Sequence, residues 1–212
     1  MPIEVELKFT ADGPGPLRAL ASVARLGAAT LGPPHTFDEV DRYLDTPDGR
    51  LAAQRWACRL RSREGRTRVS LKGPPESGSG GQIHRRPEIE APATESTDPA
   101  SWPPSEARSF LDALRGNAPL VERLRLAQRR SERDVRVDGD ELGTLTLDVV
   151  GVEAGGRPVG RFHVVELELR TSGTADDEAG LLGLGAALEA VDGLRPEPRT
   201  KLEHALSLLA SP

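Results

Sequence analysis

Strict alternation of apolar and charged residues runs through several segments of this chain, and this pattern limits its fold more than any other feature. In residues 3–9, apolar side chains occupy the odd positions from Val5 to Phe9, and charged side chains occupy the even positions from Glu4 to Lys8. A period of two is that of a β-strand with one buried face and one polar face. Residues 121–137 are strand-like but are also compatible with a helix. Similar patterns predict strands at residues 3–9, 40–44, 56–63, 66–72, 84–91, 121–137, 143–152 and 161–170.

Apolar residues at helical spacing predict four helices among and after these strands. They cover residues 17–27, 105–114, 175–191 and a last segment that begins near Thr200, which has Glu203 at capping-box spacing. The order of elements predicts an α+β protein with a dominant antiparallel sheet. The length of 212 residues fits one domain, and no internal repeat divides it.

A polar face is assigned to each predicted strand except residues 40–44, and the position of these faces decides the architecture. On a single strand of an antiparallel sheet, a charged face usually looks at water. Here several helices carry apolar stripes that must cover the apolar side of the sheet, so the charged faces lie together on the opposite side. A sheet of this many strands tends to curl and close, which removes its exposed edges. With helices outside, the charged side chains would line the barrel interior as a polar tunnel.

The charged faces combine acids and bases in equal numbers. The acids are Glu4, Glu6, Glu88, Glu90, Asp148, Glu166 and Glu168. The bases, which include all three lysines of a chain with 28 Lys and Arg residues, are Lys8, Arg59, Arg61, Lys72, Arg86, Arg130 and Lys201. A charged interior is costly unless its groups are paired, hydrated or filled with ligand. Because carboxylates suit Mg²⁺ or Mn²⁺ and cationic side chains suit phosphate oxygens, this set predicts a site for a metal and a polyanion.

Composition argues against several other functional classes. A net charge of −5 disfavours nucleic-acid binding through bulk basic charge. The single Cys58 excludes an internal disulfide framework and a cysteine zinc cluster. No apolar run is long enough to span a bilayer, and the first residues lack the pattern of a signal peptide. We therefore expect a cytoplasmic protein, monomeric or homodimeric, with a small-molecule ligand and no nucleic-acid or membrane partner.

The charged positions also form an ordered set of motifs that covers nearly the whole chain. These are Glu4-x-Glu6-x-Lys8, Tyr43-Leu44-Asp45-Thr46-Pro47, Cys58-Arg59-Leu60-Arg61, Ser70-Leu71-Lys72, Arg86-x-Glu88-x-Glu90, Arg129-Arg130-Ser131, Asp148, Glu166-Leu167-Glu168 and Thr200-Lys201-Leu202-Glu203. In this order they resemble the CYTH superfamily, the triphosphate tunnel metalloenzymes. The chain departs from that pattern at Leu202, where a tyrosine is usual, and at Pro87, which interrupts the fifth strand.

The resemblance implies an eight-stranded antiparallel β-barrel, open at both ends, with helices packed outside. It implies one tunnel domain over residues 1–212, without the CHAD domain often fused in this family. A triphosphate would lie along the tunnel with one or two Mg²⁺ or Mn²⁺ ions.

Residue roles also follow from the resemblance. The metal ligands would be Glu4, Glu6, Asp148, Glu166 and Glu168. A second acidic site would consist of Glu88 and Glu90. The residues around the attacking water, expected to be catalytic, would be Glu4, Glu6 and Lys8. The phosphate ligands would be Lys8, Arg59, Arg61, Lys72, Arg86, Arg130 and Lys201.

Three functions are compatible with such a site. The first is a metal-dependent triphosphatase that cleaves inorganic triphosphate, because aromatic residues are only 3% of the chain and few can stack a base. Nucleoside or thiamine triphosphates would be slower substrates. The second is an adenylyl cyclase of the CYTH type that converts ATP to cyclic AMP, with residues 73–82 as a loop able to close over the nucleoside. The third is a non-catalytic polyphosphate- or nucleotide-binding module, for which seven carboxylates would serve no purpose.

Overall fold

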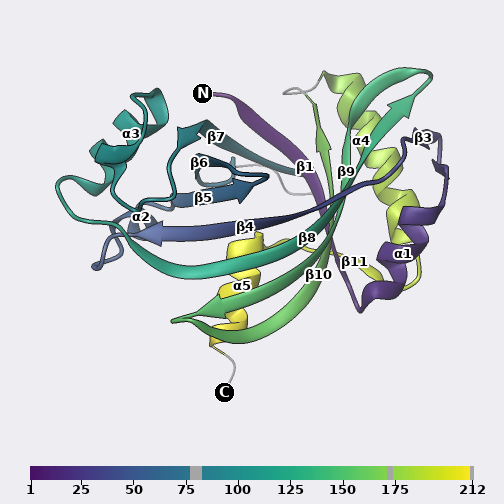
Figure 1. Ribbon diagram of the computed structural model, residues 1–212. Helices are drawn as coiled ribbons and strands as arrows, with labels where there is room; N and C mark the ends of the chain where they lie inside the picture. The colour runs from purple at the N-terminus through teal and green to yellow at the C-terminus, as the bar shows by residue number, and fades with distance from the viewer. Residues whose placement is uncertain (77–82, 171–173, 211–212) are drawn as a thin grey trace.

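Eight antiparallel strands close into a β-barrel in this computed structural model, which describes residues 1–76, 83–170 and 174–210 (Figure 1). The strands follow the order β8-β4-β5-β6-β7-β1-β10-β9 around the barrel, and β9 pairs again with β8 to close it. The expected α+β barrel is therefore confirmed, and residues 121–137 form a strand. The eight strands are β1 (Ile3–Ala11), β4 (His35–Asp45), β5 (Ala57–Arg63), β6 (Arg66–Lys72), β7 (Ile83–Ala93), β8 (Val121–Val137), β9 (Asp140–Ala154) and β10 (Arg157–Leu169).

Short elements extend the barrel wall. Strands β2 (Arg25–Leu26) and β3 (Ala29–Leu31) form a hairpin that pairs with β8, and β11 (Leu194–Pro196) pairs with β1. Strands β8 and β9 are joined by a tight turn in which Asp138 and Gly139 have φ values of 53° and 94°. Positive φ at both central residues is the geometry that matches the twist of a two-residue hairpin.

The first helix is shorter than the predicted residues 17–27. Helix α1 is Pro14–Ser22, and the chain becomes extended at Val23. The buried guanidinium of Arg133 explains this end, because it donates hydrogen bonds to the backbone oxygens of Leu20 and Val23. In a longer helix, these carbonyl groups would accept hydrogen bonds from backbone N–H groups of the next turn. Here a side chain from β8 donates to them instead.

The other three predicted helices begin close to their predicted positions, whereas the short α2 and η1 were not predicted. Ser105, Thr174 and Thr200 each cap a helix by accepting a hydrogen bond from a backbone N–H of the first turn. The last two of these caps are complete capping boxes. The helical elements after α1 are α2 (Arg50–Ala53), the 3₁₀ turn η1 (Pro99–Ser101), α3 (Glu106–Arg115), α4 (Ala175–Glu189) and α5 (Lys201–Leu209).

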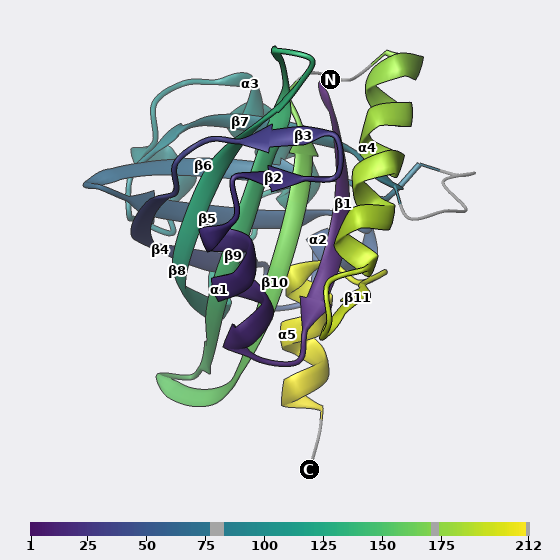
Figure 2. The same ribbon diagram turned by 90° about the vertical axis from the view of Figure 1, so that its right-hand side faces the viewer.

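Helices cover the apolar outer faces of the barrel at two places. Helices α1 and α4 pack on the outward side chains of β1, β9 and β10, among them Leu7 and Leu167, which are fully buried. Helix α3 packs with α2 on β5, β6 and β7, where Leu60 and Cys58 are buried. Figure 2 shows α4 running alongside β1. Because the outer faces are apolar and covered, the charged side chains of the same strands point inward, as expected.

The inner face of the barrel is apolar at one end. Moving along β9 and β10, the inward positions change from Asp148 to Val150 and from Glu166 to Val164. Ala205 of α5 is buried in the same cluster as these valines, so α5 packs across this end of the barrel. The barrel therefore differs from the expected tunnel open at both ends, because apolar side chains fill one of them.

Candidate functional site

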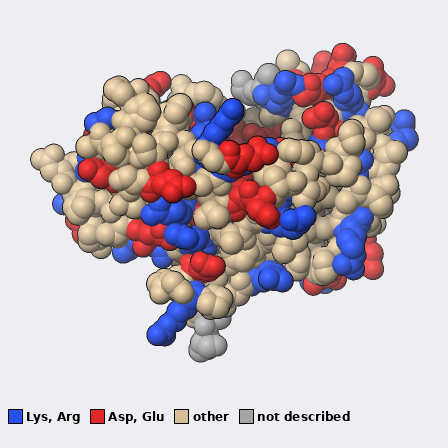
Figure 3. Space-filling model, viewed as in Figure 1, with Lys and Arg blue, Asp and Glu red and all other residues tan. Residues whose placement is uncertain are grey.

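A cavity of about 630 Å³ occupies the charged part of the barrel. This volume lies within the range of small-molecule binding sites. Figure 3 shows acidic and basic side chains intermingled on the face seen in Figure 1. Asp148 is fully buried and does not line the cavity itself. The other residues predicted for the site all line the cavity: Glu4, Glu6, Lys8, Arg59, Arg61, Lys72, Arg86, Glu88, Glu90, Arg130, Glu166, Glu168 and Lys201.

Glu4 is bound by two cations from neighbouring strands. Lys72 Nζ donates to one carboxylate oxygen of Glu4 at 2.6 Å, and Arg86 Nε donates to the other at 2.8 Å. Burial alone would raise the pKa of Glu4, but the charges of Lys72 and Arg86 hold this pKa well below its ordinary value. Lys72 also lies 3.2 Å from Glu88 on β7. This side of the cavity therefore holds ionised carboxylates and cations in direct contact.

A second ion-pair group lies deeper in the barrel and joins the last helix to the wall. Arg130 donates two hydrogen bonds of 2.8 Å to the two oxygens of Asp148. Lys201 Nζ donates to Asp148 at 2.6 Å and to Glu166 at 2.7 Å. Burial raises the pKa of Glu166, yet Lys201 and Lys8 lower it well below its ordinary value. The Lys201 ammonium is thus held by carboxylates, which offsets its unfavourable place in the first turn of α5.

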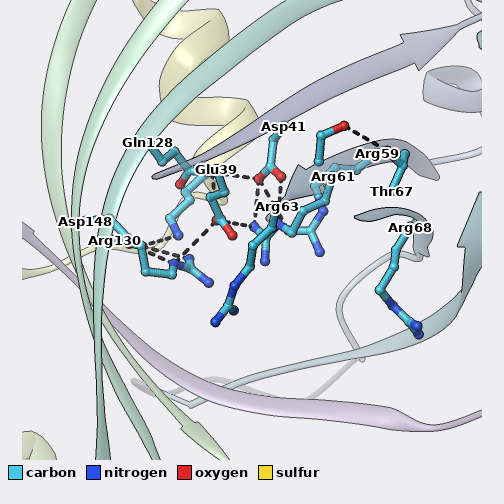
Figure 4. A network of polar contacts seen from close by, with 12 residues as sticks. Glu39, Asp41, Arg59, Arg61, Arg63, Thr67, Arg68, Gln128, Arg130 and Asp148 are labelled. Atoms are coloured by element: carbon cyan, nitrogen blue, oxygen red, sulfur yellow. Dashed lines mark hydrogen bonds and ion pairs between the residues drawn. The ribbon is translucent and has the colours of Figure 1, made fainter. Parts of the chain in front are cut away.

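Two buried acids of this site were missed by the sequence analysis. Glu39 and Asp41 lie on the inward face of β4, and Arg61 binds both oxygens of Asp41 at 2.7 Å (Figure 4). Gln128 donates to Asp41 at 2.8 Å and to Glu39 at 3.2 Å. The prediction began this strand at residue 40 and so excluded Glu39. Both acids could have been predicted from the alternation of buried and exposed residues along the whole of β4, which begins at His35.

Among the seven predicted cations, Arg59 and Lys8 have the loosest contacts. The guanidinium of Arg59 lies 3.5–3.7 Å from the nearest oxygens of Asp41, Glu88 and Glu90, and its Nε has no hydrogen-bond partner in the part of the chain that the structure describes. Lys8 Nζ lies 2.8 Å from Glu6 Oε1, but the angles do not make a hydrogen bond. Both side chains are buried and charged, so an anion in the cavity would supply the acceptors that they lack.

Glu168 is the exception among the predicted acids, because no described cation contacts its carboxylate. It lies on β10 opposite Glu6 of β1, and its side chain is open to the cavity. Its enclosure in the barrel and the carboxylates of Glu4 and Glu6 raise the pKa of Glu168 to about 7. An excess of negative charge at one side of the cavity is what a bound cation would relieve.

The described residues do not form a ready-made metal cage. No group of three His, Cys, Asp or Glu side chains within residues 1–76, 83–170 and 174–210 has the arrangement of a metal site. The predicted ligands fall into two groups. Glu4 and Glu6 act electrostatically on Glu168, which lies opposite Glu6, whereas Asp148 and Glu166 share Lys201. Their role as metal ligands stays a prediction. Glu4, Glu6 and Glu168 supply carboxylate oxygens, which Mg²⁺ and Mn²⁺ prefer as ligands.

The remaining predictions for the cavity have mixed outcomes. Pro87 does not break β7, because it lies opposite Ile3 at the beginning of β1, and Glu88 and Glu90 keep their register with β6. Residues 77–82 of the expected loop lie outside the described residues. Trp56, to which the sequence analysis gave no role, borders the cavity.

Comparison with protein families decides where the chain belongs. The CYTH domain matches residues 2–204. The chain belongs to the CYTH family. Among solved structures, this CYTH chain is similar to a Hippeastrum protein described as a candidate adenylyl cyclase with a dominant triphosphatase activity, with a TM-score of 0.65 and 19% identity over 96% of this chain and 95% of that one.

Two further structures share the fold. A candidate adenylate cyclase from Bacillus halodurans has a TM-score of 0.63 and 20% identity over 96% of the CYTH chain and 98% of its own. The Mimivirus capping enzyme triphosphatase has a TM-score of 0.51 and 11% identity over 89% and 90% of the two chains. No curated protein matches the chain. Within the described residues, no helix is both long and apolar enough to cross a membrane.

The buried ion pair of Asp41 predicts how stability depends on pH. Burial alone would raise the pKa of Asp41, but Arg61 and Arg59 hold it well below its ordinary value. An unfolded Asp41 takes up its proton near pH 3.9, whereas the folded one does so only at lower pH. The contribution of ionised Asp41 to the free energy of unfolding is therefore complete above about pH 3.9. It is lost as the pH falls below this value and through the lower pKa of the folded protein.

We expect the Asp41→Asn variant to lose less stability on acidification than the unsubstituted chain. Denaturant unfolding from pH 6 to pH 2.5 measures this slope. Asp38→Asn is the matched control, because Asp38 lies on the outer face of the same strand with its side chain 76% exposed. An unchanged slope in Asp41→Asn would show that this ion pair does not control the acid response.

Proposed function

We propose that this chain is a divalent-metal-dependent triphosphatase that hydrolyses inorganic triphosphate to pyrophosphate and phosphate inside the barrel. One observation carries the proposal. The seven cationic side chains predicted from the sequence, which come from β1, β5, β6, β7, β8 and α5, all line one cavity, and the same cavity holds Glu168, a carboxylate that no described cation contacts. A linear polyanion accompanied by a metal ion matches both features. A triphosphatase activity is also named for the Hippeastrum structure.

The cations would bind the phosphate oxygens by exchanging partners. In the free chain, most of them contact carboxylates, as Arg61 does with Asp41 and Lys72 with Glu4. Arg59 and Lys8 have the weakest contacts, so they can bind an anion at the smallest cost in broken hydrogen bonds. The cationic groups surround the cavity, which would hold the chain of phosphates in one orientation. Positioning and charge neutralisation are the main sources of catalysis in phosphoryl transfer.

The metal would be held on the acidic side of the cavity. Glu4, Glu6 and Glu168 supply carboxylate oxygens from two adjacent strands, and we keep Glu166 and Asp148 as further members of the proposed set. Burial first, and repulsion by Glu4 and Glu6 in addition, raise the pKa of Glu168, and a cation bound there would relieve the repulsion. A bound Mg²⁺ or Mn²⁺ supplies neutralisation of phosphate charge and polarisation of the phosphorus–oxygen bonds.

A proton acceptor for the attacking water would be Glu6 in preference to Glu4. Both oxygens of Glu4 accept hydrogen bonds from Lys72 and Arg86, which hold its pKa low and make it a weak base. Glu6 Oε1 accepts no hydrogen bond from the described residues, although Lys8 Nζ lies 2.8 Å away. Lys8 would serve as a phosphate ligand, because its buried Nζ donates no hydrogen bond to a described residue.

Removal of metal is expected to abolish the activity. Phosphate release from inorganic triphosphate should require Mg²⁺ or Mn²⁺, stop when a chelator is added, and return when the ion is restored in excess. A colorimetric phosphate assay on dialysed protein measures this. Undiminished release after dialysis and in excess chelator would contradict the role of a metal.

Adenylyl cyclase is the second candidate, and Trp56 is the observation that favours it. This ring borders the cavity and packs edge-on against Phe110 with centroids 4.7 Å apart. The Trp56 ring could stack on a nucleotide base, a role for which the sequence predicted few aromatic residues. A cyclase must also hold the ribose so that its 3′-oxygen attacks the α-phosphorus, whereas a triphosphatase needs only water in line with a terminal phosphorus.

We expect inorganic triphosphate to be hydrolysed faster than ATP, and ATP with Mn²⁺ to give little or no cyclic AMP. Chromatography of the nucleotide products distinguishes the two reactions, since a cyclase releases cyclic AMP and pyrophosphate in equal amounts. Stoichiometric formation of that pair would make the protein a cyclase and reject the ordering proposed here.

A further inference from the structure

Thr146 lines the cavity and carries a buried hydroxyl group that has no hydrogen-bond partner among the described residues. The residue lies on β9, lines the cavity, and is only 6% exposed. Its Oγ1 makes no hydrogen bond to any of the residues that the structure describes. Thr46 shows the usual situation of a buried threonine, since its hydroxyl donates to Asp48 at 2.6 Å and accepts from the N–H of Arg50. Burying a hydroxyl without such partners costs free energy.

A structural role does not explain a threonine at this position. Valine has the same branched shape, favours strands equally well and carries no polar atom to satisfy. On a strand that already has buried Val150 and Val152, a third valine would fit the fold at lower cost. The hydroxyl is therefore useful only if something that enters the cavity binds it.

The surroundings of Thr146 indicate what this partner is. Four residues lie directly opposite one another across β1, β10, β9 and β8, in the order Lys8, Glu166, Thr146 and Glu132. Side chains opposite each other on adjacent strands lie about 5 Å apart, so the hydroxyl is about 10 Å from the strand of Lys8. Lys8 Nζ is the other buried side-chain atom of this row that makes no hydrogen bond to a described residue, although it lies 2.8 Å from Glu6 Oε1. Two buried donors on one wall, neither with a hydrogen-bond acceptor among the described residues, suit one ligand with several acceptor oxygens.

We infer that Thr146 is a substrate-contacting residue whose Oγ–H donates a hydrogen bond to a phosphoryl oxygen of the bound triphosphate. This inference rests on the proposed function and adds a neutral donor to its cationic ligands. A phosphoryl oxygen only accepts hydrogen bonds, so the hydroxyl must act as the donor. The acids on both sides, Glu166 and Glu132, face cations of their own, Lys201 and Arg63.

The test compares Thr146→Val with Thr146→Ser. The valine variant should unfold at the same denaturant concentration as the unsubstituted chain or at a higher one, because it removes an unsatisfied polar group. Its dissociation constant for inorganic triphosphate, measured by titration calorimetry without metal, should rise roughly ten- to a hundredfold, the range for a hydrogen bond to a charged group. Thr146→Ser should retain most of the affinity. Thr36→Val, on the outer face of β4, is the control and should change nothing at the site.

The outcomes separate this inference from the function beneath it. Normal triphosphate affinity in Thr146→Val, with an active unsubstituted chain, would overturn the inference and leave the proposed function intact. Destabilisation of Thr146→Val with unchanged affinity would assign the hydroxyl to the fold and would also overturn it. If the unsubstituted chain neither binds nor hydrolyses triphosphate, the proposed function and this inference fall together.

Discussion

The Arg130→Gln variant is expected to lose about 3–5 kcal/mol of its free energy of unfolding, the range for breaking a buried ion pair. Arg130 is 7% exposed and binds both oxygens of Asp148, which is fully buried. Without the guanidinium, Asp148 keeps only its contact with Lys201, and the carboxylate of Glu39, 3.5 Å from Arg130, loses a neighbouring cation. Equilibrium unfolding in urea measures the loss.

The chain offers a closely matched control for this variant. Arg129 is the next residue on the same strand, but it points outward with its side chain 66% exposed and contacts the exposed Asp38. Because exposed ion pairs contribute little, Arg129→Gln should leave stability unchanged. A double variant of Arg130→Gln with Asp148→Asn should lose less than the sum of the two single variants, since the residues interact directly. Equal losses for Arg129→Gln and Arg130→Gln would contradict the buried network.

The Glu168→Gln variant is expected to lose activity on the order of 10²-fold or more while keeping its stability. The loss follows from removal of a metal-binding oxygen at the point where charge develops in the reaction. Stability should hold or rise near neutral pH, because the substitution removes both the cost of enclosing a carboxylate and the repulsion by Glu4 and Glu6, which together raise the pKa of Glu168. Phosphate release and urea unfolding on the same preparation test both statements.

Glu166→Gln should lose activity to a similar degree, but with a cost in stability, because Lys201 loses one of its two carboxylate partners. Asp38→Asn serves as the control for both variants, as it removes an exposed carboxylate far from the cavity. Full activity in both Glu168→Gln and Glu166→Gln would reject the proposed metal ligands.

The barrel and its charged interior could be predicted because they depend on local periodicity. In β1, the alternation that begins at Glu4 sends every second side chain inward regardless of which strands lie beside it. The outer apolar positions, such as Leu7, were likewise correctly assigned to the faces under the helices. Capping signals such as Thr200 with Glu203 are also local and were found.

Contacts between distant segments could not be predicted in this way. The end of α1 is set by Arg133, more than a hundred positions along the chain, whose guanidinium binds the backbone oxygens there. Helix α5 shows an amphipathic pattern, but nothing local says that Ala205 packs across the barrel end rather than outside it. The pairing of Lys201 with Asp148 is of the same kind, since composition provides the charges but only the fold brings these two together.

The most direct test of the central claim is a ³¹P NMR spectrum of inorganic triphosphate incubated with the protein and Mg²⁺ or Mn²⁺, quenched with chelator before recording. We predict that the triphosphate signals disappear and that pyrophosphate and phosphate appear in equal amounts, while a parallel sample without divalent ion keeps its triphosphate. Triphosphate that remains intact with every divalent ion, despite tight binding measured by calorimetry, would make the barrel a binding module and contradict the assignment as a hydrolase.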